Sequence, residues 1–242
     1  LAVQFLLLIV GRTNSFKTSL SREIFMPFSP IDMMNFQSTP RAIELYREAV
    51  QDMVLFLDDI FASGDGNVME KFENLLRTFG DGVSRAKSNK RSDGIERSDV
   101  CGGAVVTAEE GLNSQQSSSL RYLTIPVDAS SFDGEKLRYF QHDSILARQQ
   151  GSASIMQYYF SAYIQFLETY YDEIVKEIMD IDSTLEPLPV SFPRLNTIYK
   201  AMAILARLVI RFGLVCNALT ETEATVMRQQ WLPVIQKMIL AN

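Results

Sequence analysis

The sequence predicts an α/β fold with a mainly parallel central sheet, followed by an all-helical C-terminal region. In the first half, short apolar runs alternate with segments of helical periodicity, as in strands that cross over through helices into a parallel sheet. Two of these runs are nearly unbroken, which is typical of strands covered on both faces. After about Asp128 the strand signals stop and long helical patterns follow. We therefore expect a core domain over residues 1–130 and a helical subdomain over 131–242.

Four runs are candidate strands: Val3 to Val10, Met53 to Leu57, Gly103 to Thr107 and Leu120 to Val127. The first two are the unbroken ones and should be central in the sheet.

The helices follow from capping residues and from apolar spacing. Thr39 can cap a helix that begins at Pro40 and runs to about Gln51, and Asn67 can cap another that ends at Gly80. Three long patterns occupy the C-terminal half: Ser152 to Asp180, Leu195 to Ala218 and Glu221 to Leu240. The tyrosines and phenylalanines between Tyr158 and Tyr171 surround their helix too broadly for one stripe, so part of this aromatic cluster should meet another subunit or domain.

Composition excludes several classes of protein. The chain has 242 residues, 47% of them hydrophobic, which is enough for a sizeable core. It opens on Leu1 rather than methionine, so we expect a piece of a longer protein, and its first apolar run is too short to span a membrane. Cys101 and Cys216 lie far apart and only His142 accompanies them, which argues against a disulfide framework or a zinc site and favours a cytoplasmic location.

The net charge of −6 argues against a uniformly positive surface that coats nucleic acid. One basic stretch, Arg85 to Arg97, has two open interpretations: a solvated loop, or a pore or substrate loop.

The segment from Gly11 to Thr18 has the context of a phosphate-binding loop, because it follows a predicted buried strand and precedes a plausible helix, Ser19 to Phe25. In such loops the backbone amides face the phosphates, the lysine reaches the terminal phosphates and the following hydroxyl binds magnesium. Lys17 and Thr18 fill the last two roles. The residues expected to contact ATP are Gly11, Thr13, Asn14, Ser15, Phe16, Lys17, Thr18 and Ser19.

Phe16 stands where the usual pattern has glycine. If that position requires a positive φ, phenylalanine is strained there; otherwise the loop uses a conformation open to L-residues.

The run from Val54 to Asp59 supports the assignment of the loop. Four apolar residues end in two carboxylates, which should emerge at the carboxyl edge of a parallel sheet, where ligands of such sheets bind. Asp58 is placed to hold Mg²⁺, and Asp59 to orient and deprotonate an attacking water. The alternative is two acids that simply begin a surface loop, which is common at a strand end but is disfavoured by the phosphate-binding loop upstream.

Two residues farther along complete the predicted site. Thr107 ends the third candidate strand and could bond the water or the terminal phosphate. Arg121 precedes the fourth candidate strand and could face a nucleotide bound by an adjacent subunit. An ordinary surface arginine explains Arg121 equally well.

Together the motifs GRTNSFKTS, NFQSTPRAIE, VLFLDDI, LLRTFGDGVSRAK and VVTAEE with SSLRYLTI resemble the helicase-like ATPase domains of phages and integrative mobile elements. This group lies within the additional-strand P-loop class, which includes AAA+ and RecA-like motors, and the likeness covers roughly residues 1–130. The resemblance implies ATP hydrolysis with Mg²⁺, assembly into a homo-oligomeric ring and work on DNA during replication or mobilisation of a phage or mobile element.

By position, Lys17 and Thr18 match the phosphate loop of this group, and Asp58 and Asp59 match its acidic strand. Thr107 matches the sensor position and Arg121 the arginine finger. Phe16, and aspartate where many relatives have glutamate at position 59, depart from the pattern. Two alternatives remain open: a nucleotide-gated assembly scaffold with little or no hydrolysis, and a small-molecule kinase. The kinase is disfavoured because nothing resembles an arginine-rich lid.

Overall fold

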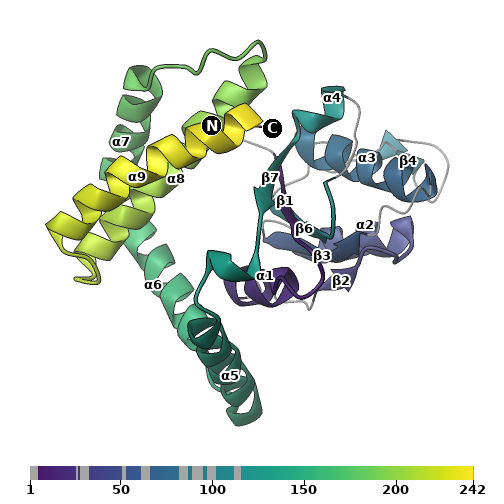
Figure 1. Ribbon diagram of the computed structural model, residues 1–242, viewed down its shortest axis with the longest axis horizontal. Coiled ribbons are helices and arrows are strands. Elements are labelled where there is room, and N and C mark those ends of the chain that lie inside the picture. Colours follow the sequence, from purple (N-terminus) through teal and green to yellow (C-terminus); the bar gives the residue numbers. More distant parts are fainter. Residues whose placement is uncertain are drawn as a thin grey trace. The chain divides into compact units, whose positions relative to one another are not determined.

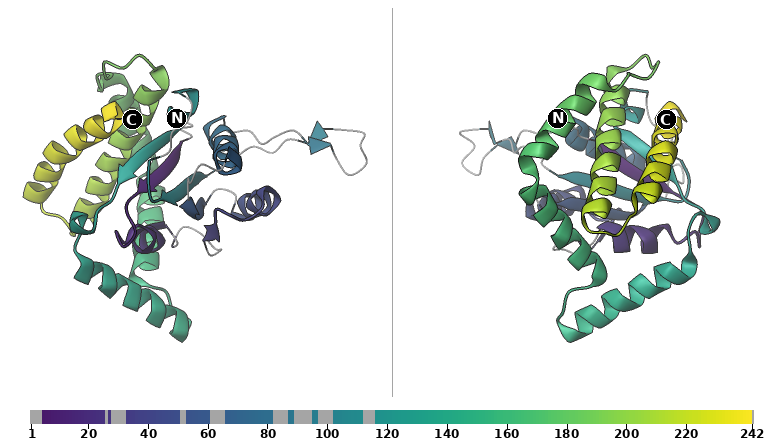
Figure 2. Two further views of the ribbon diagram at one scale, coloured as in Figure 1. Left: turned by 45° about the vertical axis from the view of Figure 1, so that its right-hand side comes forward. Right: turned by 90° about the vertical axis from the view of Figure 1, so that its left-hand side faces the viewer.

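The computed structural model describes residues 5–25, 27, 33–50, 53–60, 66–81, 87–88, 95–96, 102–111 and 116–241. These residues divide into two compact units, one up to Gln157 and one from Tyr158 onward. Figure 1 labels the elements of both units, and Figure 2 shows them from two further sides. The predicted domain boundary near residue 130 falls inside the first unit and stays a prediction.

The first unit is built on a five-stranded sheet in which every strand pair is parallel (Figure 1). The strand order is β2-β3-β6-β1-β7, so that β6 lies between β1 and β3. The predicted α/β class with a mainly parallel sheet is confirmed, and each of the four predicted strands is present. The fifth strand, β2, was not predicted. The bounds are β1 (Leu6–Val10), β2 (Met34–Asn35), β3 (Val54–Ile60), β6 (Gly103–Ala108) and β7 (Tyr122–Pro126).

Alternate residues of the strands enter two separate cores, because successive side chains of a strand point to opposite faces of the sheet. Leu55 and Leu57 of β3 pack with α2 (Pro40–Val50) and α3 (Gly66–Asp81) on one face. Phe56 packs with Phe25 of α1 (Lys17–Phe25) on the other face. The even-numbered positions of β3 up to Asp58 therefore face α1, the helix that follows the phosphate loop.

Three further helical segments complete the first unit: α4 (Gln116–Ser119), the 3₁₀ turn η2 (Ala129–Ser131) and α5 (Gly134–Gln150). The sequence prediction missed α5, which has a clear start and end. The Asp133 carboxylate accepts hydrogen bonds from the amides of Glu135 and Lys136, and Gly151 closes the helix with φ +66°.

The basic stretch from Arg85 to Arg97 lies mostly outside the described residues. Only the short strands β4 (Lys87–Ser88) and β5 (Ile95–Glu96), which pair antiparallel, are described there.

Helices alone form the second unit within the described residues, and the predicted all-helical C-terminal region is confirmed. The predicted helix from Ser152 to Asp180 is two helices that break at Tyr170, and the last helix begins with a capping box between Thr220 and Glu223. The helices are α6 (Ile155–Thr169), whose first three residues precede the boundary at Tyr158, α7 (Tyr171–Thr184), α8 (Pro193–Val215) and α9 (Glu221–Ala241). No helix within the described residues is both long enough and apolar enough to cross a bilayer.

The aromatic cluster between Tyr158 and Tyr171, which covers most of α6 and the start of α7, is partly core and partly surface. Tyr159, Tyr163 and Phe166 surround Phe212 of α8 with ring centroids 5.3–5.4 Å apart. Tyr158 and Tyr171 are each 65% exposed. The expected contact of this exposed part with another subunit or domain stays a prediction.

Candidate functional site

The phosphate loop, Gly11 to Thr18, joins β1 to α1 at the carboxyl edge of the sheet. The Gly11 amide donates a hydrogen bond to the Ala108 carbonyl at 3.1 Å. A Cβ atom on Gly11 would lie 2.4 Å from both Ser15 Oγ and the Val127 carbonyl oxygen, closer than real contacts allow. Only glycine fits where the loop leaves the sheet.

Two residues of the phosphate loop have left-handed backbone: Asn14 with φ +65° and Phe16 with φ +61°. The Phe16 position thus keeps the conformation that suits glycine, at a cost of about 1–2 kcal/mol for a phenylalanine. The Phe16 side chain is 44% exposed and meets the Phe132 ring edge-on, with centroids 6.2 Å apart. This one contact does not remove the strain, which therefore falls on the segment expected to hold phosphate.

Two polar side chains of the phosphate loop, Ser15 and Lys17, have no hydrogen-bond partner among the described residues. Ser15 is 3% exposed, and its Oγ has no hydrogen-bond partner among the described residues. Lys17 is 8% exposed, and its ammonium forms no hydrogen bond or ion pair with the residues that the structure describes. Because α1 begins at Lys17, the amides of Lys17, Thr18 and Ser19 belong to its first turn and have no partner within the helix.

A hydroxyl–carboxylate cluster, formed by Thr18, Asp58 and Thr107, lies beside the phosphate loop. The hydroxyl of Thr18 donates to Asp58 Oδ1 at 2.9 Å, and the hydroxyl of Thr107 donates to the same oxygen at 2.5 Å. Asp58 and Thr107 share the α1 face of the sheet, since both follow in phase from core residues on that side, Phe56 and Val105. The structure brings these three predicted residues together.

Asp59 is the extra residue of a bulge in β3. Leu57 pairs with Val106 and Ile60 with Ala108, so β3 has one more residue than β6 between these pairs. Asp59 takes up the excess with φ +66°, and its amide donates to Thr107 Oγ1 at 2.9 Å. The bulge leaves the Asp59 side chain exposed at the carboxyl edge, although the ladder continues to Ile60.

Thr107 connects the two aspartates. It is fully buried and its hydroxyl donates to Asp58 while accepting from the amide of Asp59. This geometry makes Thr107 a positioning residue for both. The predicted contact of Thr107 with water or phosphate stays a prediction.

Arg121 lies apart from the other predicted site residues of the same chain. It precedes β7, where its carbonyl accepts from the amide of Leu6 at 3.0 Å. Leu6 begins β1 and the phosphate loop follows the end of β1, so Arg121 lies at the amino edge of the sheet, roughly 15 Å from the phosphate loop at about 3.3 Å per residue. Its role as an arginine finger toward another subunit stays a prediction.

Sequence reasoning missed the segment that flanks the phosphate loop on its other side. Glu109 Oε1 accepts a hydrogen bond from Thr13 Oγ1 at 2.5 Å, and Phe132 contacts Phe16. Asp128 lies near Arg12, and its pKa is held below the ordinary value, first by the amide and hydroxyl of Ser130 and last by the Arg12 charge. Of these residues, only Glu109 carried a signal, as an acid just after the third strand.

These residues fit a magnesium–triphosphate ligand. The hydroxyl of Thr18 and the carboxylate of Asp58 are oxygen ligands of the kind that Mg²⁺ takes, with phosphate oxygens and water completing its shell. The buried Ser15 hydroxyl and the Lys17 ammonium supply donors to an anion. Within the described part of the chain, no three His, Cys, Asp or Glu side chains gather as a metal site. The pair of Thr18 and Asp58 is a metal candidate because of the chemistry of its own oxygens.

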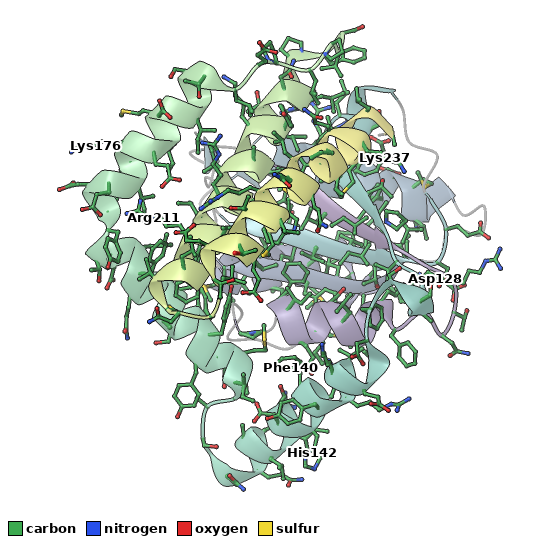
Figure 3. All side chains as sticks on the ribbon, turned by 60° about the vertical axis from the view of Figure 1, so that its left-hand side comes forward. Asp128, Phe140, His142, Lys176, Arg211 and Lys237 are labelled. Atoms are coloured by element: carbon green, nitrogen blue, oxygen red, sulfur yellow. The ribbon has the colours of Figure 1, made fainter. Side chains whose placement is uncertain are left out.

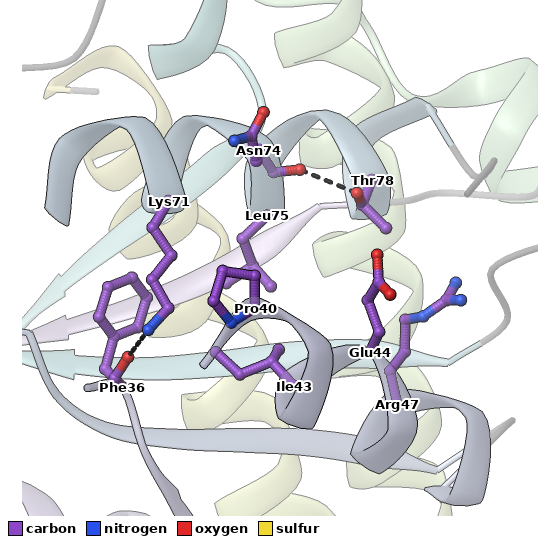
Figure 4. Close-up of a pocket in the computed structure, with 9 residues that line it drawn as sticks. All are labelled: Phe36, Pro40, Ile43, Glu44, Arg47, Lys71, Asn74, Leu75 and Thr78. Atoms are coloured by element: carbon purple, nitrogen blue, oxygen red, sulfur yellow. Dashed lines mark hydrogen bonds between the residues drawn. The ribbon is translucent and has the colours of Figure 1, made fainter. Parts of the chain in front are cut away.

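A separate pocket of about 100 Å³ lies between α2 and α3 (Figure 4). The Lys71 ammonium donates hydrogen bonds to the carbonyl oxygens of Phe36 and Ser38 there. Burial lowers the pKa of Lys71. This pocket shares no residue with the phosphate loop or the hydroxyl–carboxylate cluster.

Comparisons with known proteins give structural likenesses only. No protein-family model and no curated protein matches the sequence. Among solved structures, the chain is similar to JCV helicase, with 16% identity over 82% of this chain and 54% of that one and a TM-score of 0.43. A second JCV helicase structure, with an inhibitor bound, gives 15% identity, the same coverages and a TM-score of 0.40.

The C-terminal region of NrS-1 is also similar, with 11% identity over 98% of this chain and 58% of that one and a TM-score of 0.36. The chain thus spans little more than half the length of the structures it matches.

Proposed function

We propose that this chain binds ATP with Mg²⁺ at the phosphate loop and hydrolyses it, as a helicase-like motor domain. The observation that carries the proposal is the hydroxyl–carboxylate cluster: Thr18 and Thr107 both donate to Asp58 Oδ1, at 2.9 and 2.5 Å, beside a loop that follows the central strand β1. A hydroxyl and a carboxylate side by side next to a phosphate-binding loop are the oxygen ligands that would hold Mg²⁺ against a phosphate.

In this proposal each residue has a separate task. The Lys17 ammonium would neutralise charge on the terminal phosphates, and Thr18 with Asp58 would hold the metal. Bound Mg²⁺ would supply charge neutralisation on the transferred phosphoryl group. Asp59, exposed on its bulge, would orient and deprotonate the attacking water. Thr107 would keep Asp59 and Asp58 at a fixed separation through its two hydrogen bonds.

The strand order supports placing this chain in the additional-strand P-loop class. One strand, β6, lies between the strand that leads into the phosphate loop and the strand that carries the carboxylates, and this insertion is the feature for which that class is named. Work on DNA and assembly into a ring, with Arg121 acting on a neighbouring subunit's nucleotide, rest on the sequence resemblance and are part of the proposal.

A nucleotide-gated scaffold is the second candidate function, and Phe16 is the observation that favours it. A phenylalanine held at φ +61° in the phosphate loop would slow hydrolysis if the loop must adjust as the phosphate leaves. Such a chain would bind ATP and assemble without turnover.

The test is magnesium-dependent ATP binding and turnover by the whole chain. We expect Lys17→Ala to weaken ATP binding and Thr18→Ala to abolish its dependence on Mg²⁺. Asp59→Asn should keep binding but lower turnover roughly 10²- to 10⁴-fold, the usual contribution of a general base. Turnover with and without single-stranded or duplex DNA then tests the motor.

Matched controls keep the comparison fair. Lys136→Ala removes a lysine that is 80% exposed on α5, and Asp180→Asn changes an exposed aspartate of α7. Both should behave as the native chain. Equal turnover in the native, Lys17→Ala and Asp59→Asn chains contradicts the catalytic assignment, and nucleotide-dependent assembly without turnover selects the scaffold.

A further inference from the structure

A second pocket lies wholly within the helical unit, between α7, α8 and α9, with a volume of about 360 Å³. That volume is within the range of small-molecule sites and exceeds the needs of a bare inorganic ion. Its lining is mainly apolar and includes three arginines and one acidic residue, Glu177, which pairs with Arg211. Pockets of this kind hold an apolar body and fix a charged end. The apolar part of the lining includes Ala203, Ala206, Ile210, Leu214, Leu232 and Ile235.

Positive charge is concentrated at this arginine pocket. Arg207, Arg211 and Arg228 line it, and the only other arginine from Tyr158 onward is Arg194. The gathering is not explained by the composition of the helical unit, in which acidic residues outnumber basic ones. Two helices contribute, because Arg207 and Arg211 belong to α8 and Arg228 belongs to α9.

The three guanidinium groups are not equivalent. Arg211, which is labelled in Figure 3, already has partners within the fold. It pairs with Glu177 at 2.9 Å and with Glu173 at 3.4 Å, and it lies over the ring of Tyr170. Arg228 is about half exposed, and its pairing with Glu221 is long, at 3.8 Å. Arg207 is exposed and forms no hydrogen bond or ion pair with the described residues. Arg207 and Arg228 are therefore the groups able to bind an anion in a bidentate manner.

Trp231 adds an aromatic surface beside these charges. It lines the same pocket and lies one helical turn after Arg228 on α9, so the two side chains share a face of the helix. A groove with arginines for phosphate and an aromatic ring for a base is the arrangement that binds single-stranded nucleic acid.

We propose that the arginine pocket binds one nucleotide unit of single-stranded DNA, with the base against Trp231 and the phosphate between Arg207 and Arg228. The choice of DNA over another aromatic anion rests on the proposed function. The pocket itself belongs to a different unit of the chain from the phosphate loop, so the two sites can be tested separately.

Trp231 is the only tryptophan of the chain, so its intrinsic fluorescence reports on this pocket alone. We expect an oligothymidylate to quench that fluorescence in the whole native chain. Replacing both arginines, Arg207→Gln with Arg228→Gln, should weaken binding roughly 5- to 150-fold, which corresponds to about 1–3 kcal/mol for one stacked and anchored nucleotide. Thymidine monophosphate, titrated alone, distinguishes a free nucleotide from a strand: quenching only by the oligonucleotide selects the strand.

The matched control is Arg194→Gln with Lys237→Gln, which removes the same charge from the same two helices outside the pocket. This control should bind as the native chain does. Equal weakening in both double variants means that only general charge matters and overturns the proposal. So does oligonucleotide binding that leaves Trp231 fluorescence unchanged.

The Lys17→Ala chain separates the two proposals. Quenching that survives in this variant together with loss of ATP binding supports both sites. An absence of ATP turnover in the native chain with normal quenching refutes the hydrolysis proposal alone. Normal turnover without quenching refutes the arginine pocket alone.

Discussion

The hydroxyl–carboxylate cluster and the phosphate loop are neighbours with opposite character. In the cluster, Thr107 is fully buried and the Asp58 carboxylate accepts from two hydroxyls. In the phosphate loop, Asn14 and Phe16 have left-handed backbone, while the Ser15 hydroxyl and the Lys17 ammonium have no partner among the described residues. The metal side of the candidate site is thus formed in advance, whereas the phosphate side holds strain and unpaired donors that an anion would satisfy.

The largest expected effect comes from crowding the start of the phosphate loop. Gly11→Ala places a methyl group 2.4 Å from Ser15 Oγ and from a backbone carbonyl, so the loop must shift, and we expect a loss of about 2–3 kcal/mol in the free energy of unfolding. Urea unfolding measures this loss. Gly111→Ala is the control, because nothing lies within 4 Å of a Cβ there. Equal stabilities of the two variants would show that the phosphate loop is not rigid.

Thr107→Val tests whether the cluster is formed in advance. The substitution keeps the shape but leaves the Asp59 amide and Asp58 Oδ1 each without one hydrogen bond, which should cost about 1–2 kcal/mol. Thr107→Ser keeps the hydroxyl and should restore most of the loss. Because Thr107 positions Asp59, ATP turnover should fall in the valine variant more than ATP binding does. A parallel fall of both would limit Thr107 to a structural role.

Sequence patterns predict the central strands well because burial on both faces leaves an unbroken apolar run, as in β1 and β3. The same reasoning explains why the sequence predicts that Asp58 and Thr18 lie close together. Asp58 directly follows the apolar run of β3, and Thr18 ends the loop that follows β1. Sequence reasoning fails at Asp59. The sequence predicts that β3 stops at Leu57, but a bulge extends the strand to Ile60. The bulge depends on a hydrogen bond to Thr107 in a different strand, and local pattern contains no trace of such a partner.

Two other features escaped sequence reasoning for related reasons. Helix α5 buries only Leu137 and Ala147, so it lacks the apolar stripe by which helices are recognised, although Asp133 is a good capping residue. Arg121 precedes β7, which runs parallel to β1, so it lies at the amino edge of the sheet. Which residues of an adjacent subunit it would face depends on an assembly, and local sequence carries no information on that.

Phe16→Gly tests the strain of the phosphate loop. Glycine adopts φ +61° without cost, but the edge contact with Phe132 is lost, so the change in the free energy of unfolding should be small, within about 1 kcal/mol. Turnover of ATP is the sensitive measurement, and we expect it to rise. Phe16→Leu, which keeps a strained L-residue, should not raise it. If ATP turnover rises in neither variant, the backbone strain at Phe16 does not limit hydrolysis, and the scaffold becomes the better explanation of the phosphate loop.

The smallest effect concerns the segment that flanks the phosphate loop at Asp128. Hydrogen bonds from the Ser130 amide and hydroxyl, and the nearby Arg12 charge, hold the pKa of Asp128 below the ordinary aspartate value. Since the folded-state pKa is lower than the unfolded one, the stabilising contribution is complete above the unfolded pKa of about 3.9 and disappears as the pH falls through the folded value. Carboxyl chemical shifts followed against pH measure this pKa directly.

Ser130→Ala should raise the pKa of Asp128 part of the way toward its ordinary value, because the Ser130 amide still donates when the hydroxyl is gone. Arg12→Ala should raise it less, since the Arg12 charge is the last and smallest of the causes. A larger effect of Arg12→Ala than of Ser130→Ala would mean that the phosphate loop, and not the local turn, controls Asp128. The flanking segment would then report directly on the charge state of the phosphate loop.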